Sequence, residues 1–162
     1  MLKRVNIYDC DGILLDSLHR YQTKDGKIDL AHWRENDVRE MILKDTPSVL
    51  ANHYRTALKN PEIFVVIATA RACEYNDANY EHIFSTLGKP DLFIHRMGAN
   101  DNRGGAELKI EGILPFINQP ELVNANIHVY EDNHNYLHDL CHAFTENGHY
   151  TIGHYNPSKQ WN

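Results

Sequence analysis

The sequence predicts an α/β fold, a three-layer sandwich built on a mainly parallel, Rossmann-like sheet. Short apolar segments with strand character alternate along the chain with longer segments of helical character. Strands that alternate with helices imply parallel pairing and right-handed crossovers. The chain has 162 residues, of which 42% are apolar and 23% charged, and this fits one domain with a full core. We therefore expect a single domain over residues 1–162.

Five segments are predicted to be strands. Residues 4–9 are rich in β-formers and end in an acidic turn. Residues 63–68 form a continuous apolar run, as expected for a strand that is covered on both faces. Residues 91–95 and 127–131 are shorter strands, and residues 150–155 are expected to add an edge strand.

Helices are predicted between these strands, over residues 37–44, 47–59, 74–87, 106–118 and 133–147. Thr46 and Pro47 are typical of a helix N-cap followed by proline in the first helical position. Gly88 and Gly148 stand where helix C-caps belong. The segment at about residues 17–60 is too long for one simple crossover, so we expect a small cap-like insertion there rather than a separate domain.

Charge and cysteine usage exclude several classes of protein. The chain has 16 Lys+Arg against 22 Asp+Glu, a net charge of −6 with histidine neutral. Extensive duplex binding is not expected, because such binding rests on neutralising many phosphates. Cys10, Cys73 and Cys141 are too widely spaced for a disulfide framework, which favours a reducing compartment. No apolar run is long enough to span a membrane, and we expect a cytoplasmic protein.

Polar clusters follow three of the predicted strands, where ligands bind in an open parallel sheet. Carboxylates gathered at one sheet edge repel each other unless a cation joins them, and oxygen ligands suit Mg²⁺. A lysine and a threonine nearby would complement an anion with tetrahedral oxygens. The candidate site residues are Asp9, Asp11, Thr69, Ala70, Arg71, Lys109, Glu131 and Asp132.

The order of these motifs resembles the haloacid dehalogenase (HAD) superfamily of phosphohydrolases: D-x-D-G, then threonine, then lysine, then an acidic pair. The stretches I-A-T-A-R, L-F-I-H-R-M-G, G-G-A-E-L-K-I and V-Y-E-D-N resemble, more closely, small phage-encoded and nucleic-acid end-repair-type HAD phosphatases. The chain departs from the common pattern at Ile13, at Ala70 in place of glycine, and at Glu131 in place of aspartate.

The resemblance implies a role for each motif residue. Asp9 would be the nucleophile that forms an aspartyl-phosphate, and Asp11 the general acid and base. Mg²⁺ would be held by Asp9, by Asp11 through its backbone carbonyl, and by the acidic pair, Asp132 or Glu131 being the direct ligand. Lys109 would be catalytic and would bind the substrate phosphate together with Thr69, Ala70 and Arg71. For the Arg71 side chain, a bidentate phosphate contact and a pairing with a nearby carboxylate are equally compatible with the sequence.

The expected function is therefore Mg²⁺-dependent phosphomonoester hydrolysis, with a nucleotide or a nucleic-acid terminal phosphate as substrate. If the protein is phage-encoded, its location is the host cytoplasm. A small-metabolite phosphatase is one alternative, and a non-catalytic HAD-like domain that binds a phosphorylated ligand or a partner protein is another. Retention of both Asp9 and Asp11 disfavours the last, because a binding domain has no need of an acid.

Two further features allow two interpretations each. His134, His138 and His142 recur on one face of a predicted helix. They are either part of a polar surface or ligands of a transition metal. Trp33, in the insertion, is either a core residue or a platform on which a base stacks.

Overall fold

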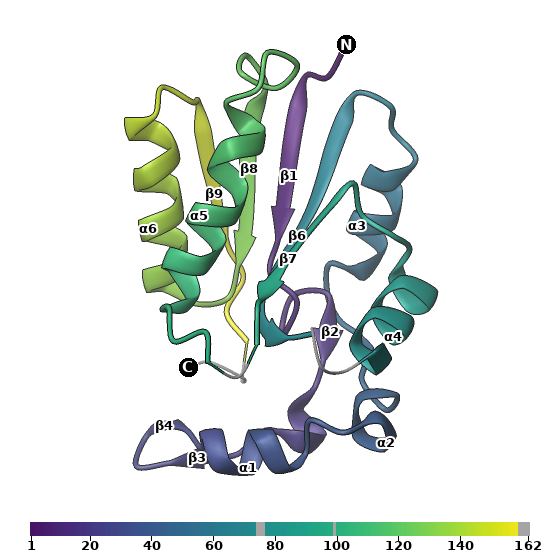
Figure 1. The fold of residues 1–162 in the computed structure, drawn as a ribbon. Coiled ribbons are helices and arrows are strands. Elements are labelled where there is room, and N and C mark those ends of the chain that lie inside the picture. The colour runs from purple at the N-terminus through teal and green to yellow at the C-terminus, as the bar shows by residue number, and fades with distance from the viewer. Residues whose placement is uncertain (74–76, 99, 159–162) are drawn as a thin grey trace.

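The computed structural model describes residues 1–73, 77–98 and 100–158 of the chain. Its central sheet has five strands in the order β7-β6-β1-β8-β9, each parallel to its neighbours (Figure 1). These strands are β1 (Arg4–Tyr8), β6 (Ile63–Ala72), β7 (Leu92–Arg96), β8 (Asn126–Glu131) and β9 (Thr151–Tyr155). The predicted fold class is confirmed, and β9 lies at an edge as expected.

Helices cover both faces of the sheet and make the three layers (Figure 1). One face carries α5 (Gly105–Ile117) and α6 (His134–Glu146), and the other carries α3 (Ala51–Leu58) and α4 (Asp77–Leu87). Ile7 of β1 packs in the α5–α6 layer and Tyr8 in the α3–α4 layer, which is the alternation that a strand between two layers requires. Across the described ranges, no helix is long and apolar enough to cross a bilayer.

The helix predicted over residues 47–59 begins later than expected. Thr46 and Pro47 form a short strand, β5 (Thr46–Pro47), which pairs with β2 (Leu15–Asp16), and α3 starts only at Ala51. The amides of Ser48 and Leu50 donate to backbone carbonyls in the loop after β1, so this segment is held extended. Proline is tolerated because β5 belongs to a two-stranded edge. The N-cap prediction for Thr46 and Pro47 is wrong.

Other boundaries differ by less. The helix predicted over residues 74–87 is α4, and its first three residues lie outside the described ranges. Strand β6 runs on to Ala72, four residues past its predicted end at residue 68, and therefore contains the threonine motif.

The chain between β1 and α3 lies across the carboxyl ends of the sheet strands (Figure 1). Its elements are β2, η1 (Leu18–Arg20), β3 (Thr23–Lys24), β4 (Lys27–Ile28), α1 (Leu30–Glu35), α2 (Arg39–Ile42) and β5. Asp29 caps α1 by accepting from the His32 amide at 3.1 Å. Helix α3 packs on the sheet instead, through Tyr54 and Ala57. Only the part of the segment before residue 51 therefore faces the strand ends.

Candidate active site

Three carboxylates meet at the carboxyl ends of β1 and β8. These strands pair in register up to Tyr8 and Tyr130, so Asp9 and Glu131 follow at the same level. The side chains of Asp9, Glu131 and Asp132 place one oxygen each within 4.8 Å of one another, and all three residues are buried. No other group of three or more potential metal ligands occurs among the described residues.

Lys109 from α5 supplies a positive charge to this group. Its Nζ donates to Asp9 Oδ1 at 2.8 Å and to Glu131 Oε2 at 2.7 Å. Burial by itself would lower the pKa of Lys109, but the charges of Asp9 and Glu131 raise it above its usual value. Burial and the Glu131 charge raise the pKa of Asp9, against the opposing effect of Lys109. The Lys109 side chain is therefore protonated, although it is buried among carboxylates.

The two members of the acidic pair have different surroundings. Glu131 is fully engaged, because its Oε1 accepts from the amides of Asp132 and Asn133 at 3.2 and 3.3 Å while Oε2 accepts from Lys109. Asp132 accepts a short hydrogen bond from Ser158 on Oδ2, and its Oδ1 is buried without a hydrogen-bond partner. Burial raises the pKa of Asp132 to about 7, in spite of the hydrogen bond from Ser158. An unpartnered buried carboxylate oxygen is costly, and a cation would satisfy it.

The Asp11 carboxylate is not part of this acidic group. It accepts from Arg71 Nε at 3.0 Å on Oδ2, from Arg71 Nη2 at 2.5 Å on Oδ1, and from Ser17 Oγ at 2.7 Å. Burial opposes ionisation of Asp11, but the charge and hydrogen bonds of Arg71, the charge of Arg20 and the hydrogen bond from Ser17 together lower the pKa of this carboxyl below its usual value. Asp9 and Asp11 thus stand in two separate charge environments two positions apart.

The threonine motif lies where β6 bulges away from β7. Pairing is regular to Ala68 and resumes only at Ala72, so residues 69–71 stand opposite a shorter stretch of β7. Thr69 Oγ1 accepts from the Arg71 amide at 3.1 Å. The Arg71 guanidinium also donates to Asn79 and to Asp45, at 2.9 and 2.8 Å. Of the two interpretations open for Arg71, the geometry matches the carboxylate pairing.

These motifs open on one cavity of about 450 Å³. Its floor consists of Asp9, Asp11, Ala70, Arg71, Lys109, Glu131 and Asp132, while Thr69 is buried behind the wall. One wall comes from the segment that lies across the strand ends, with Ile28, Leu30, Trp33, Arg34 and Asp37. The opposite wall is the loop after β7, which Arg96 ties down by donating to the carbonyls of Asp101 and Arg103 at 2.8 and 2.6 Å.

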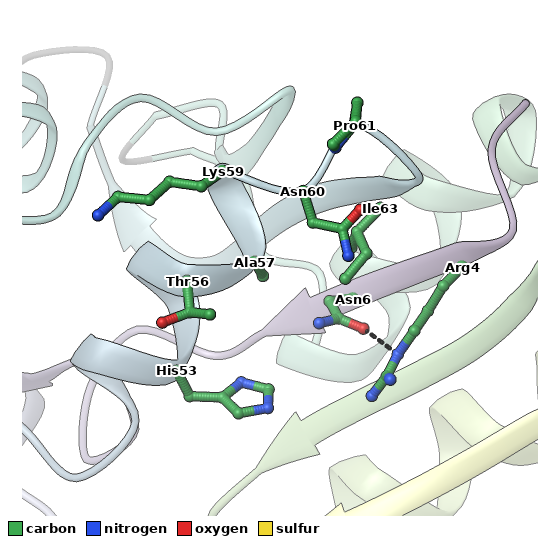
Figure 2. A pocket seen from close by; sticks show the side chains of 9 residues that line it. All are labelled: Arg4, Asn6, His53, Thr56, Ala57, Lys59, Asn60, Pro61 and Ile63. Atoms are coloured by element: carbon green, nitrogen blue, oxygen red, sulfur yellow. Dashed lines mark hydrogen bonds between the residues drawn. The ribbon is translucent and has the colours of Figure 1, made fainter.

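Figure 2 shows a second hollow, of about 370 Å³, at the opposite end of the sheet, where β1 and β6 begin. The side chains of Arg4 and His53 reach toward the same open space, whereas Lys59 extends away from it. No carboxylate or nucleophilic thiol is among the nine residues that line this hollow. The chemistry predicted from the sequence therefore belongs to the first cavity.

The histidines of α6 form no metal cluster within the described part of the chain. His138 and His142 stack with ring centroids 6.1 Å apart, and their side chains are 73% and 63% exposed. His134 packs edge-on against Tyr155. The polar-surface interpretation fits these three residues.

Several residues of the site have no motif signal. Ser17, Arg20 and Asp45 lie in polar segments, where a buried network and a solvated face have the same composition. Tyr136 lines the cavity with its ring 5.6 Å from Lys109 Nζ. Ser158 belongs to a stretch of the C-terminus that has no regular secondary structure. None of these could be found from spacing, because each meets its partner only through the tertiary fold.

Known structures share this architecture. The HAD domain of the effector protein Lem4 from Legionella pneumophila has a TM-score of 0.66 and 14% identity, over 99% of this chain and 90% of that chain. A HAD-superfamily hydrolase of subfamily IA from Geobacter sulfurreducens has a TM-score of 0.57 and 13% identity, over 93% and 89%. A chain of the Pnkp1/Rnl/Hen1 RNA repair complex matches with a TM-score of 0.61 and 16% identity, over 96% of this chain but only 43% of its own length. These likenesses show the HAD fold.

A family model gives a closer relationship. The model described as bacteriophage T5 5′-deoxynucleotidase matches residues 1–83, which is 83 of 162 residues and just over half of the chain. The matched part includes Asp9, Asp11 and the threonine motif. No curated protein matches the chain. The fold and this match agree that the protein is a HAD-like phosphohydrolase of the phage type, and the chain belongs to the bacteriophage T5 5′-deoxynucleotidase family.

Proposed function

We propose that this phosphatase hydrolyses the phosphomonoester of a deoxynucleoside 5′-monophosphate, with Mg²⁺ and through an aspartyl-phosphate on Asp9. The observation that carries the proposal is the separation of two carboxyl groups on one cavity floor. Asp9 belongs to a buried acidic group that holds a lysine, while Asp11 is paired with an arginine and a serine outside that group. Two carboxyl groups with different partners on one cavity floor can take different roles in a reaction.

The residues at the acidic group fit a magnesium ion. Asp9 and Asp132 are the best candidates to hold it, because Asp132 Oδ1 is buried without a partner and Glu131 is occupied by Lys109 and two amides. The Asp11 side chain is engaged by Arg71, which leaves its backbone carbonyl for the expected role. When bound, Mg²⁺ would screen the repulsion between these carboxylates and the substrate phosphate.

In the proposed mechanism Asp9 attacks phosphorus. Lys109 engages Oδ1, which leaves Oδ2 as the nucleophilic oxygen. As the new P–O bond forms, the bond to the nucleoside 5′-oxygen breaks, and that oxygen takes a proton from Asp11. The charge that develops on the phosphoryl oxygens is stabilised by the Lys109 ammonium ion.

Asp11 would act again in the second step. Arg71 and Ser17 hydrogen-bond to both of its oxygens, which favours the carboxylate form. A carboxylate can accept the proton of the water that cleaves the aspartyl-phosphate, and a substrate that enters as its phosphate monoanion would bring the proton that Asp11 passes to the next leaving oxygen. The role of Arg71 in both steps is to orient Asp11 instead of binding phosphate.

Ala70 would complete the phosphate site, and Thr69 would support it from behind. Thr69 is buried and does not line the cavity, and its hydroxyl accepts from the Arg71 amide, so it would hold the backbone of this stretch in place instead of touching the phosphate. Ala70 itself lines the cavity.

The family and the cavity together support a mononucleotide substrate. The related family is described as a 5′-deoxynucleotidase. A volume of about 450 Å³ lies in the range of small-molecule sites, about 300–1,000 Å³. We assign residues 17–50 as a small cap, in which Trp33 offers an aromatic face and Arg34 a hydrogen-bond donor to a nucleoside.

A phosphate-release assay with three groups of substrates tests this function. We expect turnover of deoxynucleoside 5′-monophosphates in MgCl₂, none in EDTA, and much lower rates with sugar phosphates and with a 5′-phosphorylated oligonucleotide. Asp9→Asn should lose at least about 10³-fold in kcat while keeping its circular dichroism spectrum, because an amide cannot form the covalent intermediate. Higher rates on sugar phosphates or on the oligonucleotide end would overturn the substrate class, and an active Asp9→Asn protein would overturn the mechanism.

The metal assignment has its own readout. MgCl₂ should raise the Tm of the wild type and should not raise the Tm of Asp132→Asn, because the amide removes the charge that we assign to the ion. An equal rise in both proteins would place the ion elsewhere.

A further inference from the structure

Asp45 is a buried carboxylate of the cap that lies outside all of the sequence motifs. Its side chain is 0% exposed and accepts from two different arginines. Arg20 donates to both of its oxygens, from Nε at 3.0 Å and from Nη2 at 2.9 Å. Arg71 donates to its Oδ2 from Nη2 at 2.8 Å. His19 adds a contact of 2.8 Å to Oδ1.

The same Arg71 nitrogen also reaches Asp11. Nη2 of Arg71 lies 2.5 Å from Asp11 Oδ1 and 2.8 Å from Asp45 Oδ2, so the two carboxylates share one donor group. Arg71 Nε donates to Asp11 and Nη1 donates to Asn79. A guanidinium is a planar, rigid fork, and its orientation is determined once both of its sides are engaged. Asp45 therefore helps to set, together with Asn79, the angle at which Arg71 presents its Nε and Nη2 to Asp11.

The backbone at Asp45 is itself held in place. Its carbonyl accepts from His82 Nε2 of α4 at 2.7 Å. The residues that follow it form β5, which pairs with β2. Both the backbone and the side chain of Asp45 are therefore held in place. A surface residue that only neutralised charge would not be held in this way.

We propose that Asp45 is a positioning residue for the reaction: through Arg71 it holds Asp11 in place beside the leaving oxygen. The inference rests on the proposed acid role of Asp11. Without Asp45, Arg20 and Arg71 would lose a shared buried counter-ion, and only Asp11 and Asn79 would hold the Arg71 guanidinium. Misplacing a group by about 1 Å costs up to about 10²-fold in rate.

The network also reaches the wall of the cavity. The Arg20 guanidinium carbon lies 4.2 Å from the centre of the Trp33 ring, and Trp33 lines the cavity. A chain of contacts through Arg20, Asp45 and Arg71 thus links Trp33 in the cavity wall to Asp11, the proposed acid. Contact between a nucleoside and Trp33 would stabilise the cap arrangement in which Asp11 is correctly held.

The test compares Asp45→Asn with the wild type on two substrates of different leaving group. An alkoxide needs a proton to depart and a nitrophenolate does not, so loss of a well-placed acid shows mainly on the nucleotide. We expect single-turnover cleavage of the deoxynucleotide to slow by about 10- to 100-fold, and the nitrophenol burst from p-nitrophenyl phosphate by less than about threefold. KM should change little.

A double variant separates positioning from folding. If Asp45 acts through Asp11, then Asp11→Asn/Asp45→Asn should cleave the nucleotide no more slowly than Asp11→Asn alone. Asp45→Glu keeps the charge, so it should remain folded, and it should show a smaller loss with the same leaving-group selectivity. Arg39→Gln is the matched control, because it breaks an exposed ion pair between the cap and α4 that does not reach Asp11.

The outcomes are distinguishable from failure of the proposed function. Equal losses on both substrates, or a further loss in the double variant, would mean that Asp45 only stabilises the fold and would overturn the inference. If Asp45→Asn does not fold, Asp45→Glu decides by the same comparison. If Asp11→Asn itself lacks leaving-group selectivity, the acid role of Asp11 fails first, and this inference fails with it.

Discussion

Single side chains at this site depend on one another through charge. Lys109 is the only cation that contacts the acidic group of Asp9, Glu131 and Asp132 among the described residues. It lies in a dry environment, where unlike charges attract strongly and an unpaired charge is costly. Lys109 therefore balances the charge of the buried carboxylates, and in the proposed mechanism it also binds the phosphoryl group.

Lys109→Met is expected to separate these functions. The thioether fills most of the space, but the carboxylates lose their cation, which costs about 3–5 kcal/mol for a broken buried pair. We expect this loss in urea unfolding with EDTA, a partial recovery with MgCl₂, and a fall in kcat of at least about 10²-fold in both cases.

The matched control is Lys89→Met, since Lys89 is exposed and forms no ion pair with any of the described residues. It should unfold within about 0.5 kcal/mol of the wild type and keep full activity. A Lys109→Met protein as stable as this control would show that the carboxylates are neutral in the free enzyme.

At the scale of elements, the tight turn after β1 aligns the two aspartates. Gly12 has a φ of +82°, and its amide donates to the Leu15 carbonyl at 2.8 Å. A Cβ at this position would clash with Asp132 Oδ2 and lie 2.5 Å from Ser158 Oγ. The turn thus needs glycine both for its backbone conformation and for the close approach of the acidic pair.

A comparison of Gly12→Ala with Gly26→Ala separates the cost of the backbone conformation from the cost of crowding Asp132. Gly26 has a φ of +74°, and no atom lies within 4 Å of the position that an added methyl group would take. Its substitution should therefore cost only the left-handed strain, about 1–2 kcal/mol. Gly12→Ala should cost more and should also reduce the Mg²⁺-dependent rise in Tm, because Asp132 must move. Equal stability and an equal Mg²⁺ effect in both variants would contradict the crowding.

On the scale of the whole molecule, the sheet carries a polar aromatic cluster away from the active site. Arg4 donates to His128 and Tyr130 at 3.1 and 3.0 Å, and His128 contacts His154 at 2.9 Å. Tyr130 stacks on His154 with ring centroids 4.4 Å apart. Burial and the Arg4 charge lower the pKa of His128 to about 4, and the pKa of His154 is lowered for the same reasons.

This cluster should make stability depend on pH. The unfolded chain protonates His128 near the ordinary histidine pKa of 6.5, whereas the native state does so only near a pKa of about 4. The His128 contribution is therefore complete above about pH 6.5 and declines as the pH falls toward 4. His128→Gln should remove this pH-dependent contribution. The difference in unfolding free energy between the wild type and His128→Gln should therefore shrink as the pH falls from about 6.5 toward 4. A difference that is constant with pH would contradict the lowered pKa.

The layer architecture and the end of the sheet that carries the candidate site could both be predicted from the sequence. Alternating apolar segments predicted the parallel sheet, because hydrophobic periodicity is a local property of the chain. The ends of those strands predicted where Asp9, Glu131 and Asp132 would meet, since parallel strands bring their carboxyl ends to one edge. Lys109 followed from its motif and does contact two of them.

The partner of each buried charge, in contrast, depends on how distant segments pack together. Arg71 could have faced phosphate or a carboxylate, and the fold gives it Asp11 and Asp45, residues 60 and 26 positions away. The same holds for β5, where distant backbone carbonyls hold Pro47 extended against its local preference for a helix start. Buried ion pairs and strand pairings form between segments that are distant in sequence, and their energy depends on geometry that no local pattern encodes.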